Sequence, residues 1–282
     1  MGTYLPALPK QAGLTPVCAA PQFGLRFLSL ASLRLPTTGA VHTLDTGSDE
    51  VGLDLLAGVG AITARGPWGE VEYPEAGRRA SAFAGPPSMV YLPRHSLAHI
   101  TCHLAPLEAL VVRAKSRRDG RPRLLQPEAT EVLTFGHANW ERSVFACIGP
   151  DVEADRLMMG ETHTPSGNWS SYPPHKHDTN QPPERVSEEI YHFLIDPPFG
   201  FGLQTLWNPA TPPKAPEQTA IVVHNGDSVI IPDGYHPVVV APGFRMITVW
   251  ACAGDRRAWG AWSAEPEYAR LLEAPSSPDG EP

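Results

Sequence analysis

The stretch that decides the fold is Gly167-Asn168-Trp169-Ser170-Ser171-Tyr172-Pro173-Pro174-His175-Lys176-His177-Asp178, which Glu188-Glu189-Ile190-Tyr191 follows. His175 and His177 are two residues apart, and residues two apart in a β-strand point to the same face. Two imidazoles on one face, with a carboxylate further along the chain, can form one side of a metal site. A third histidine, His236, comes late enough to lie on another strand. The sequence therefore predicts a site of three histidines and one glutamate inside a small β-barrel.

The alternation of a strand decides between the two glutamates. Only one of Glu188 and Glu189 can face a barrel interior, because neighbouring strand residues point to opposite faces. Tyr191 and Phe193 share the face of Glu189, and their bulk suits an interior. We therefore predict Glu189 as the ligand and Glu188 as outward-facing. Neutral imidazoles with one carboxylate suit zinc, manganese or iron, and the residue types alone do not choose among these divalent ions.

The alternative to a metal site is that His175 and His177 belong to a surface loop, as most His-x-His pairs do. Two features favour the metal site over that alternative. A carboxylate follows on an apolar strand, and His236 lies in the corner Gly234-Tyr235-His236-Pro237. Four protein ligands leave positions open on a five- or six-coordinate ion, where oxygens of a substrate could bind, so the pattern is catalytic.

The composition favours many short strands over long helices. The chain has 282 residues with 32 prolines and 25 glycines, and these are spread along its length. In the second half, strand-like segments recur about every 8–14 residues between turn signals such as Asn225-Gly226-Asp227 and Ala241-Pro242-Gly243. This pattern predicts an antiparallel sandwich or barrel. The one helix that we expect is terminal, from about Glu265 to Glu273.

The two halves share a rough order of motifs. Each half has an apolar strand followed by a corner with proline and then histidine: Tyr91-Leu92-Pro93-Arg94-His95 and Ile231-Pro232-Asp233-Gly234-Tyr235-His236. We therefore predict two related barrels, in residues 1–135 and 136–282. The first half lacks a His-x-His pair, so we expect it to be free of metal.

Charge and cysteine content exclude several classes. The net charge is −8 without a basic stripe, so nucleic acid is not an expected partner. The four cysteines are far apart, which argues against a disulfide framework or a zinc ribbon. Neither an apolar run long enough for a membrane span nor a leader-like segment in 1–16 is present. We expect a cytoplasmic enzyme without a membrane partner, and a homo-oligomer paired through sheet edges.

The motif set resembles the cupin superfamily, and more closely the 5-deoxy-glucuronate isomerase family of myo-inositol catabolism. The resemblance runs from about Arg156 to Trp262, and more loosely over Arg78 to Pro93. Besides the opening stretch, the motifs that carry it are Glu188-Glu189-Ile190-Tyr191, Pro197-Pro198-Phe199-Gly200-Phe201-Gly202-Leu203-Gln204, Gly234-Tyr235-His236-Pro237 and Ala241-Pro242-Gly243-Phe244. After Gly243 the family tends to have two tyrosines, whereas this chain has Met246-Ile247-Thr248.

The resemblance implies an all-β bicupin fold, with two double-stranded β-helix (jelly-roll) barrels. It implies a metal-dependent aldose–ketose isomerase that converts a small sugar acid, 5-deoxy-D-glucuronate, to 5-dehydro-2-deoxy-D-gluconate. The metal ligands that it carries over are His175, His177, Glu189 and His236.

Such a reaction needs groups that move a proton and a cation that binds the substrate carboxylate. Tyr191, in phase with Glu189, and Gln204, on the next strand, are candidates to contact the substrate. Glu188 and Lys176 are weaker candidates for the base. For the carboxylate, the candidates are Arg245, Arg185, Arg156 and Lys176.

Two other functions stay open at this point. A cupin metal-dependent dioxygenase can use the same three histidines and one glutamate. A non-catalytic sugar-binding cupin would keep the fold and lose the metal.

Overall fold

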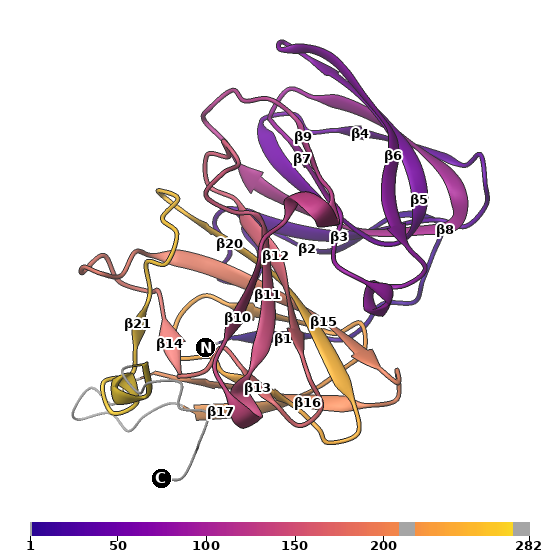
Figure 1. Cartoon of the computed structure of the whole chain (residues 1–282). Helices are drawn as coiled ribbons and strands as arrows, with labels where there is room; N and C mark the ends of the chain where they lie inside the picture. Colours follow the sequence, from indigo (N-terminus) through magenta and orange to yellow (C-terminus); the bar gives the residue numbers. More distant parts are fainter. Residues whose placement is uncertain (1, 209–217, 273–282) are drawn as a thin grey trace.

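A computed structural model describes residues 2–208 and 218–272, which form two β-barrels packed against each other (Figure 1). In Figure 1 the indigo-to-magenta strands of the first barrel lie above the second barrel, whose later strands are orange to yellow. The prediction of an all-β fold is confirmed. The boundary between residues 135 and 136 stays a prediction, and two strands that precede it, Thr3–Leu5 and Val132–Phe135, pair with the sheet of the second barrel.

The first barrel is one eight-stranded antiparallel sheet that bends back on itself. Its two longest strands run along each other, and a sharp corner lies at Gly58, where φ is +84° and a Cβ would come within 2.5 Å of the Pro106 carbonyl oxygen. Only glycine tolerates that position. The strands are β2 (Gly13–Ala19), β3 (Leu28–Leu35), β4 (Val41–Asp45), β5 (Asp49–Gly66), β6 (Gly69–Arg79), β7 (Met89–Leu92), β8 (Leu97–Lys115) and β9 (Arg123–Leu125).

The second barrel closes a seven-stranded sheet, ordered β1-β18-β15-β20-β12-β11-β10, over a four-stranded sheet, ordered β13-β19-β16-β17. The short strands β14 and β21 pair with each other. The strands are β1 (Thr3–Leu5), β10 (Val132–Phe135), β11 (Arg142–Ile148), β12 (Met158–Thr164), β13 (Trp169–Ser170), β14 (His175–Lys176), β15 (Ser187–Asp196), β16 (Phe201–Trp207), β17 (Gln218–His224), β18 (Ser228–Ile231), β19 (Val238–Val240), β20 (Arg245–Gly254) and β21 (Ser263–Ala264).

The central strands of the seven-stranded sheet, β12, β15 and β20, are buried on both faces. One face lines the second barrel, where Phe193 packs in one cluster with Leu206 of the four-stranded sheet. The other face packs against the first barrel, where Ile190 and Val249 share a cluster with Val112 of β8. Alternate residues of β15 therefore enter two different cores, which is the alternation that the sequence predicts for this strand.

The prediction of a terminal helix from Glu265 to Glu273 is wrong over the described residues. A turn leads into a short 3-10 helix, η5 (Ala269–Leu272), in which the Leu271 N–H binds the carbonyl three residues back. Glu273 lies outside the described residues. The segment between Pro266 and Pro275 is too short to propagate an α-helix. The other 3-10 turns are η1 (Gln22–Gly24), η2 (Ala82–Ala84), η3 (Pro127–Ala129) and η4 (Ala138–Trp140).

Where the structure describes the chain, we find no helix with the length and apolar character needed to cross a membrane.

Candidate metal centre

Three histidines and a glutamate meet inside one end of the second barrel. His175 begins β14, His177 follows it, and His236 lies in the corner between β18 and β19. Glu189 reaches them from β15, and its Oε2 lies 3.1 Å from His177 Nε2 and 3.3 Å from His236 Nε2. The ring of His175 lies 4.8 Å from that of His236. The structure thus brings together the four residues predicted as ligands.

The backbone sets the tautomer of all three imidazoles. Each ring places its Nδ1 against a carbonyl oxygen: His175 against Pro173 at 3.3 Å, His177 against Ser187 at 2.7 Å and His236 against Gly234 at 2.8 Å. A carbonyl only accepts, so Nδ1 carries the proton in each neutral ring, and the lone pair is left on Nε2. For His177 and His236 this lone pair faces Glu189. Metal-binding histidines are held in this way.

For His175 and Glu189, burial and charge favour the protonation states that bind a metal. Burial, and then the neighbouring imidazoles, lower the pKa of His175 to about 3, so its ring is neutral near pH 7. Burial alone would raise the pKa of Glu189, but the two imidazoles that face its carboxylate, those of His177 and His236, outweigh burial and hold the pKa far below its ordinary value. A neutral imidazole and an ionised carboxylate are the forms that coordinate a divalent ion.

Cys252 is a neighbour that the sequence did not single out. It lies directly opposite Glu189 in the β15–β20 pair. Its sulfur and the ligand atoms of His177 and Glu189 all lie within 4.8 Å of one another. The only signal that could have found it is the pairing register between two distant strands, which a single sequence does not carry.

Tyr191 and Gln204, both predicted to contact the substrate, line the same space. The Tyr191 ring lies 5.9 Å from that of His236, and its hydroxyl is 2.7 Å from Ser171 Oγ. Burial, and then the charge of Glu189, raise the pKa of Tyr191 well above its ordinary value, so the phenol keeps its proton. The Gln204 amide nitrogen donates to the His236 carbonyl at 2.8 Å. Its buried Oε1 has no hydrogen-bond partner among the described residues.

Glu188 and Lys176 are not placed to act as bases. Glu188 lies on the opposite face of β15, where its carboxylate accepts backbone N–H groups of the first barrel, including that of Leu28 at 2.7 Å. The Lys176 ammonium is paired with Asp178 and Glu184, and these two carboxylates outweigh burial and raise its pKa. The alternation of β15 and the pairing of Lys176 therefore exclude both side chains from the site.

The network around Lys176 holds the histidine-bearing loops together. Glu184 accepts from Lys176 Nζ at 3.0 Å and from Ser263 Oγ of β21 at 2.6 Å. Asp178, beside His177, accepts from the Gly234 backbone N–H at 2.9 Å. Three segments that are distant in sequence are thereby fixed around the imidazoles.

The predicted cations for a substrate carboxylate are engaged elsewhere. Arg245 starts β20, at the end opposite Cys252, and pairs with Asp196 at 2.7 Å. Arg156 donates to the Gly254 carbonyl, at the junction of the barrels. Arg185 is exposed and donates to the Asn180 carbonyl. None of these contacts joins an arginine to the histidine cluster.

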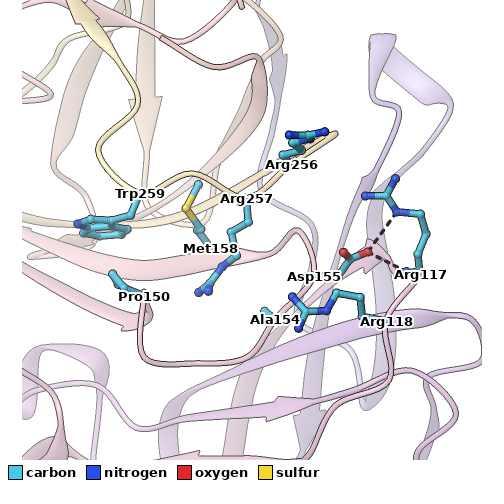
Figure 2. A pocket seen from close by; sticks show the side chains of 9 residues that line it. All are labelled: Arg117, Arg118, Pro150, Ala154, Asp155, Met158, Arg256, Arg257 and Trp259. Atoms are coloured by element: carbon cyan, nitrogen blue, oxygen red, sulfur yellow. Dashed lines mark hydrogen bonds and ion pairs between the residues drawn. The ribbon is translucent and has the colours of Figure 1, made fainter. Parts of the chain in front are cut away.

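A separate cavity of about 450 Å³ lies where the end of the first barrel meets the second (Figure 2). Arg117 is paired with Asp155 in its wall, as Figure 2 shows, and Arg257 donates to backbone carbonyls such as that of Leu157. Met158 in this wall stands directly opposite Cys252 in the β12–β20 pair. The lining residues are Arg117, Arg118, Pro150, Ala154, Asp155, Met158, Arg256, Arg257 and Trp259.

Comparisons with known proteins agree on one family. The model of the KduI/IolB family matches residues 9–271. The chain is 34% identical to a 5-deoxy-glucuronate isomerase of Geobacillus thermodenitrificans (strain NG80-2) over 240 residues, 84% of each protein. It is 30% identical to the enzyme of the same name of Bacillus subtilis (strain 168), again over 84% of each.

Solved structures agree on the fold. An IolB-like protein from Salmonella typhimurium LT2 superposes with a TM-score of 0.86 and 28% identity, covering 95% of this chain and 98% of that one. The oxalate decarboxylase of Lactobacillus farciminis superposes with a TM-score of 0.65 over 96% of this chain and 88% of that one, at 12% identity. At that identity the likeness concerns the fold alone, and it confirms the predicted bicupin architecture.

Proposed function

The chain belongs to the KduI/IolB family, and we propose that it converts 5-deoxy-D-glucuronate to 5-dehydro-2-deoxy-D-gluconate with the help of a divalent metal ion in its second barrel. It is an isomerase of inositol catabolism, and the conversion exchanges an aldose for a ketose within one molecule. The substrate is a small sugar acid.

The observation that carries the metal is the orientation of the imidazoles. Three rings are fixed by backbone carbonyls with Nε2 left to coordinate, and two of these Nε2 atoms lie against one buried carboxylate. His175, His177, Glu189 and His236 would hold the ion, and this donor set suits zinc, manganese or iron. A bound divalent ion supplies Lewis acidity, which polarises a carbonyl group and stabilises negative charge on its oxygen.

Tyr191 and Gln204 have complementary roles in this proposal. The Tyr191 phenol is neutral, so its hydroxyl donates a hydrogen bond to a substrate oxygen. The phenol thereby holds a proton against that substrate oxygen. Ser171 Oγ fixes the direction of the phenol. The partnerless Oε1 of Gln204 accepts from a substrate hydroxyl, which satisfies a buried oxygen.

The test combines metal analysis of the purified protein with an NMR assay of 5-deoxy-D-glucuronate under anaerobic conditions. We expect about one divalent ion per chain, bound by the four ligands, and conversion without oxygen. His175→Ala should lose both the ion and turnover. His99→Ala, on an exposed histidine of β8 that contacts Thr43, is the matched control and should lose neither.

Three results would contradict the proposal. Full activity in a metal-free His175→Ala protein would remove the site. Consumption of oxygen with a bound iron would indicate a dioxygenase instead. Binding of the sugar acid without metal or turnover would indicate a non-catalytic sugar-binding cupin.

The expected oligomeric state and cellular location stay predictions. We propose a homo-oligomer, for which β17 offers an edge strand with the exposed side chain Val222, and light scattering in solution measures its mass. We also propose a cytoplasmic location, which fractionation of cells that express the protein would test.

A further inference from the structure

The proposed substrate carries a carboxylate as well as a reacting carbonyl, and a cation must meet that charge when water is excluded. The four cations predicted from the sequence are paired with carboxylates, bound to backbone carbonyls or exposed. A guanidinium that the sequence did not single out, that of Arg142, is placed differently.

The strand register puts Arg142 on the inner face of the second barrel. Phe193 lies in the barrel core, and a row of directly opposite residues runs from it across the sheet: Thr248 on β20, Thr162 on β12 and Val144 on β11. Directly opposite residues in antiparallel strands point to the same face. Arg142 is two residues before Val144, so it shares that face.

The surroundings of Arg142 are aromatic and lack a counter-charge. Its guanidinium lies 5.5 Å from the Phe135 ring and 5.8 Å from the Trp140 ring, and Nη1 donates to the Trp140 carbonyl at 3.2 Å. Trp140 packs on Tyr172 at 5.6 Å, and Tyr172 follows Ser171, which holds the Tyr191 hydroxyl. Contacts therefore lead step by step from the guanidinium to the wall of the metal centre.

In the part of the chain that the structure describes, the Arg142 guanidinium is a cation without a neighbouring anion. Burial lowers the pKa of Arg142 to about 10, and among the described residues no carboxylate opposes that shift. Within the described residues, no carboxylate lies at ion-pair distance from the half-buried Arg142, and its side chain makes one hydrogen bond although the guanidinium has five N–H donors. A carboxylate that accepts two of these N–H groups would compensate the lost hydration.

The same interior face carries further unsatisfied oxygens. Among the described residues, the buried hydroxyls of Thr164 and Thr248 and the amide oxygen of Gln204 lack hydrogen-bond partners. Thr248 lies on β20 between the metal end and Arg245, within the segment where the family tends to have tyrosines. Polar atoms that are buried and unpaired are costly unless a ligand pairs with them, and a sugar acid offers several hydroxyls.

We propose that Arg142 binds the carboxylate of the substrate and thereby selects sugar acids over neutral sugars. This inference rests on the proposed function and extends it to the far end of the substrate. The arrangement is a metal centre that holds the reacting end and an aromatic-flanked guanidinium that holds the acidic end, with Tyr191 between them.

The cavity in Figure 2 is the competing place for the carboxylate, because it also adjoins the second barrel and is lined by arginines. Its geometry is less suited. Arg117 already has Asp155, and Arg257 is occupied by carbonyls. Arg118 and Arg256 are exposed, so water satisfies them and no anion is needed.

The experiment compares two substrates and two arginines. 5-Deoxy-D-glucuronate and its neutral primary amide are offered to the wild type, Arg142→Gln, Arg142→Lys and the control Arg256→Gln. We expect Arg142→Gln to lower kcat/KM for the acid about 10- to 100-fold, mainly through KM, and to leave the amide nearly unchanged. Arg142→Lys should recover part of the loss. Metal content and melting temperature should stay those of the wild type, which excludes a merely structural effect.

A preference for the acid that is unchanged in Arg142→Gln would overturn the inference. So would a loss of that preference in Arg256→Gln, because it would move the carboxylate to the cavity in Figure 2. If the wild type converts neither compound, the proposed function fails separately. Calorimetry of D-glucuronate against D-glucose then still decides the role of Arg142, since only the acid should lose affinity in Arg142→Gln.

Discussion

Glu188 and Glu50 make the same contact in opposite directions across the junction of the two barrels. Each carboxylate accepts three successive backbone N–H groups that lead into a strand of the other barrel. Glu188 binds those of Arg26, Phe27 and Leu28 at 2.7, 2.8 and 2.7 Å, and Glu50 binds those of Asp155, Arg156 and Leu157 at 2.8, 2.7 and 2.8 Å. The two halves of the chain therefore contribute equivalent contacts to the junction.

These two carboxylates should stabilise the protein and leave the chemistry unaffected. Glutamine keeps one acceptor oxygen and turns an N–H₂ group toward backbone donors, so we expect Glu188→Gln to lower the free energy of unfolding by about 1–3 kcal/mol. Urea denaturation measures the loss, and Glu72→Gln, on an exposed side chain of β6, is the control. Folded Glu188→Gln should keep its metal and turnover. Loss of turnover in a folded, metal-loaded variant would restore Glu188 as a base.

Removal of the metal should lower thermal stability. An ion that binds only the folded state adds about 2.7 kcal/mol when its free concentration is a hundred times the dissociation constant. We therefore expect a chelator to lower the melting temperature by several degrees, reversibly on adding the ion back. His236→Ala should melt at one temperature with or without the ion, whereas His99→Ala should respond like the wild type. A wild-type melting temperature that is insensitive to chelation would argue against a bound ion.

Tyr191→Phe separates chemistry from metal binding. The variant keeps the ring that packs near His236 and removes the hydroxyl that faces Ser171. Loss of a group that holds a proton in the transition state costs about 100-fold or more in kcat. We expect that loss at unchanged metal content, measured by NMR turnover and metal analysis. Tyr73→Phe in the first barrel is the matched control. A normal kcat in Tyr191→Phe would remove the phenol from the reaction.

Local patterns predicted the parts of the site that local sequence determines. The spacing of His175 and His177 and the alternation around Glu189 each depend on a few neighbouring residues, and the structure places these side chains together. The sequence did not predict Cys252 and Arg142 as site residues, because their positions depend on the register of strands far apart in the chain. The role of Glu188 had a signal, since Glu50-Val51 in the first half parallels Glu188-Glu189 in the second. Val51 occupies the position in the first barrel that corresponds to Glu189 in the second. It is buried in the apolar core of the first barrel.

The loop network around Glu184 should give the protein a characteristic acid sensitivity. Burial alone would raise the pKa of Glu184, but hydrogen bonds from Ser263 and Lys176 outweigh it and lower the pKa to about 2 from an ordinary value of 4.5. Because the folded-state pKa is the lower one, the stabilisation is fully present above pH 4.5 and is lost as the pH falls toward 2.

Glu184→Gln should therefore be less stable than the wild type at neutral pH, by about 1–3 kcal/mol, and the gap should close as the pH falls from about 4.5 to about 2. Urea denaturation at a series of pH values measures both curves, and Glu72→Gln should show no such closing gap. Since Glu184 also fixes the segment that carries His177, the variant should bind metal more weakly at neutral pH. A gap that stays constant down to pH 2 would mean that the Glu184 carboxylate does not contribute through its charge.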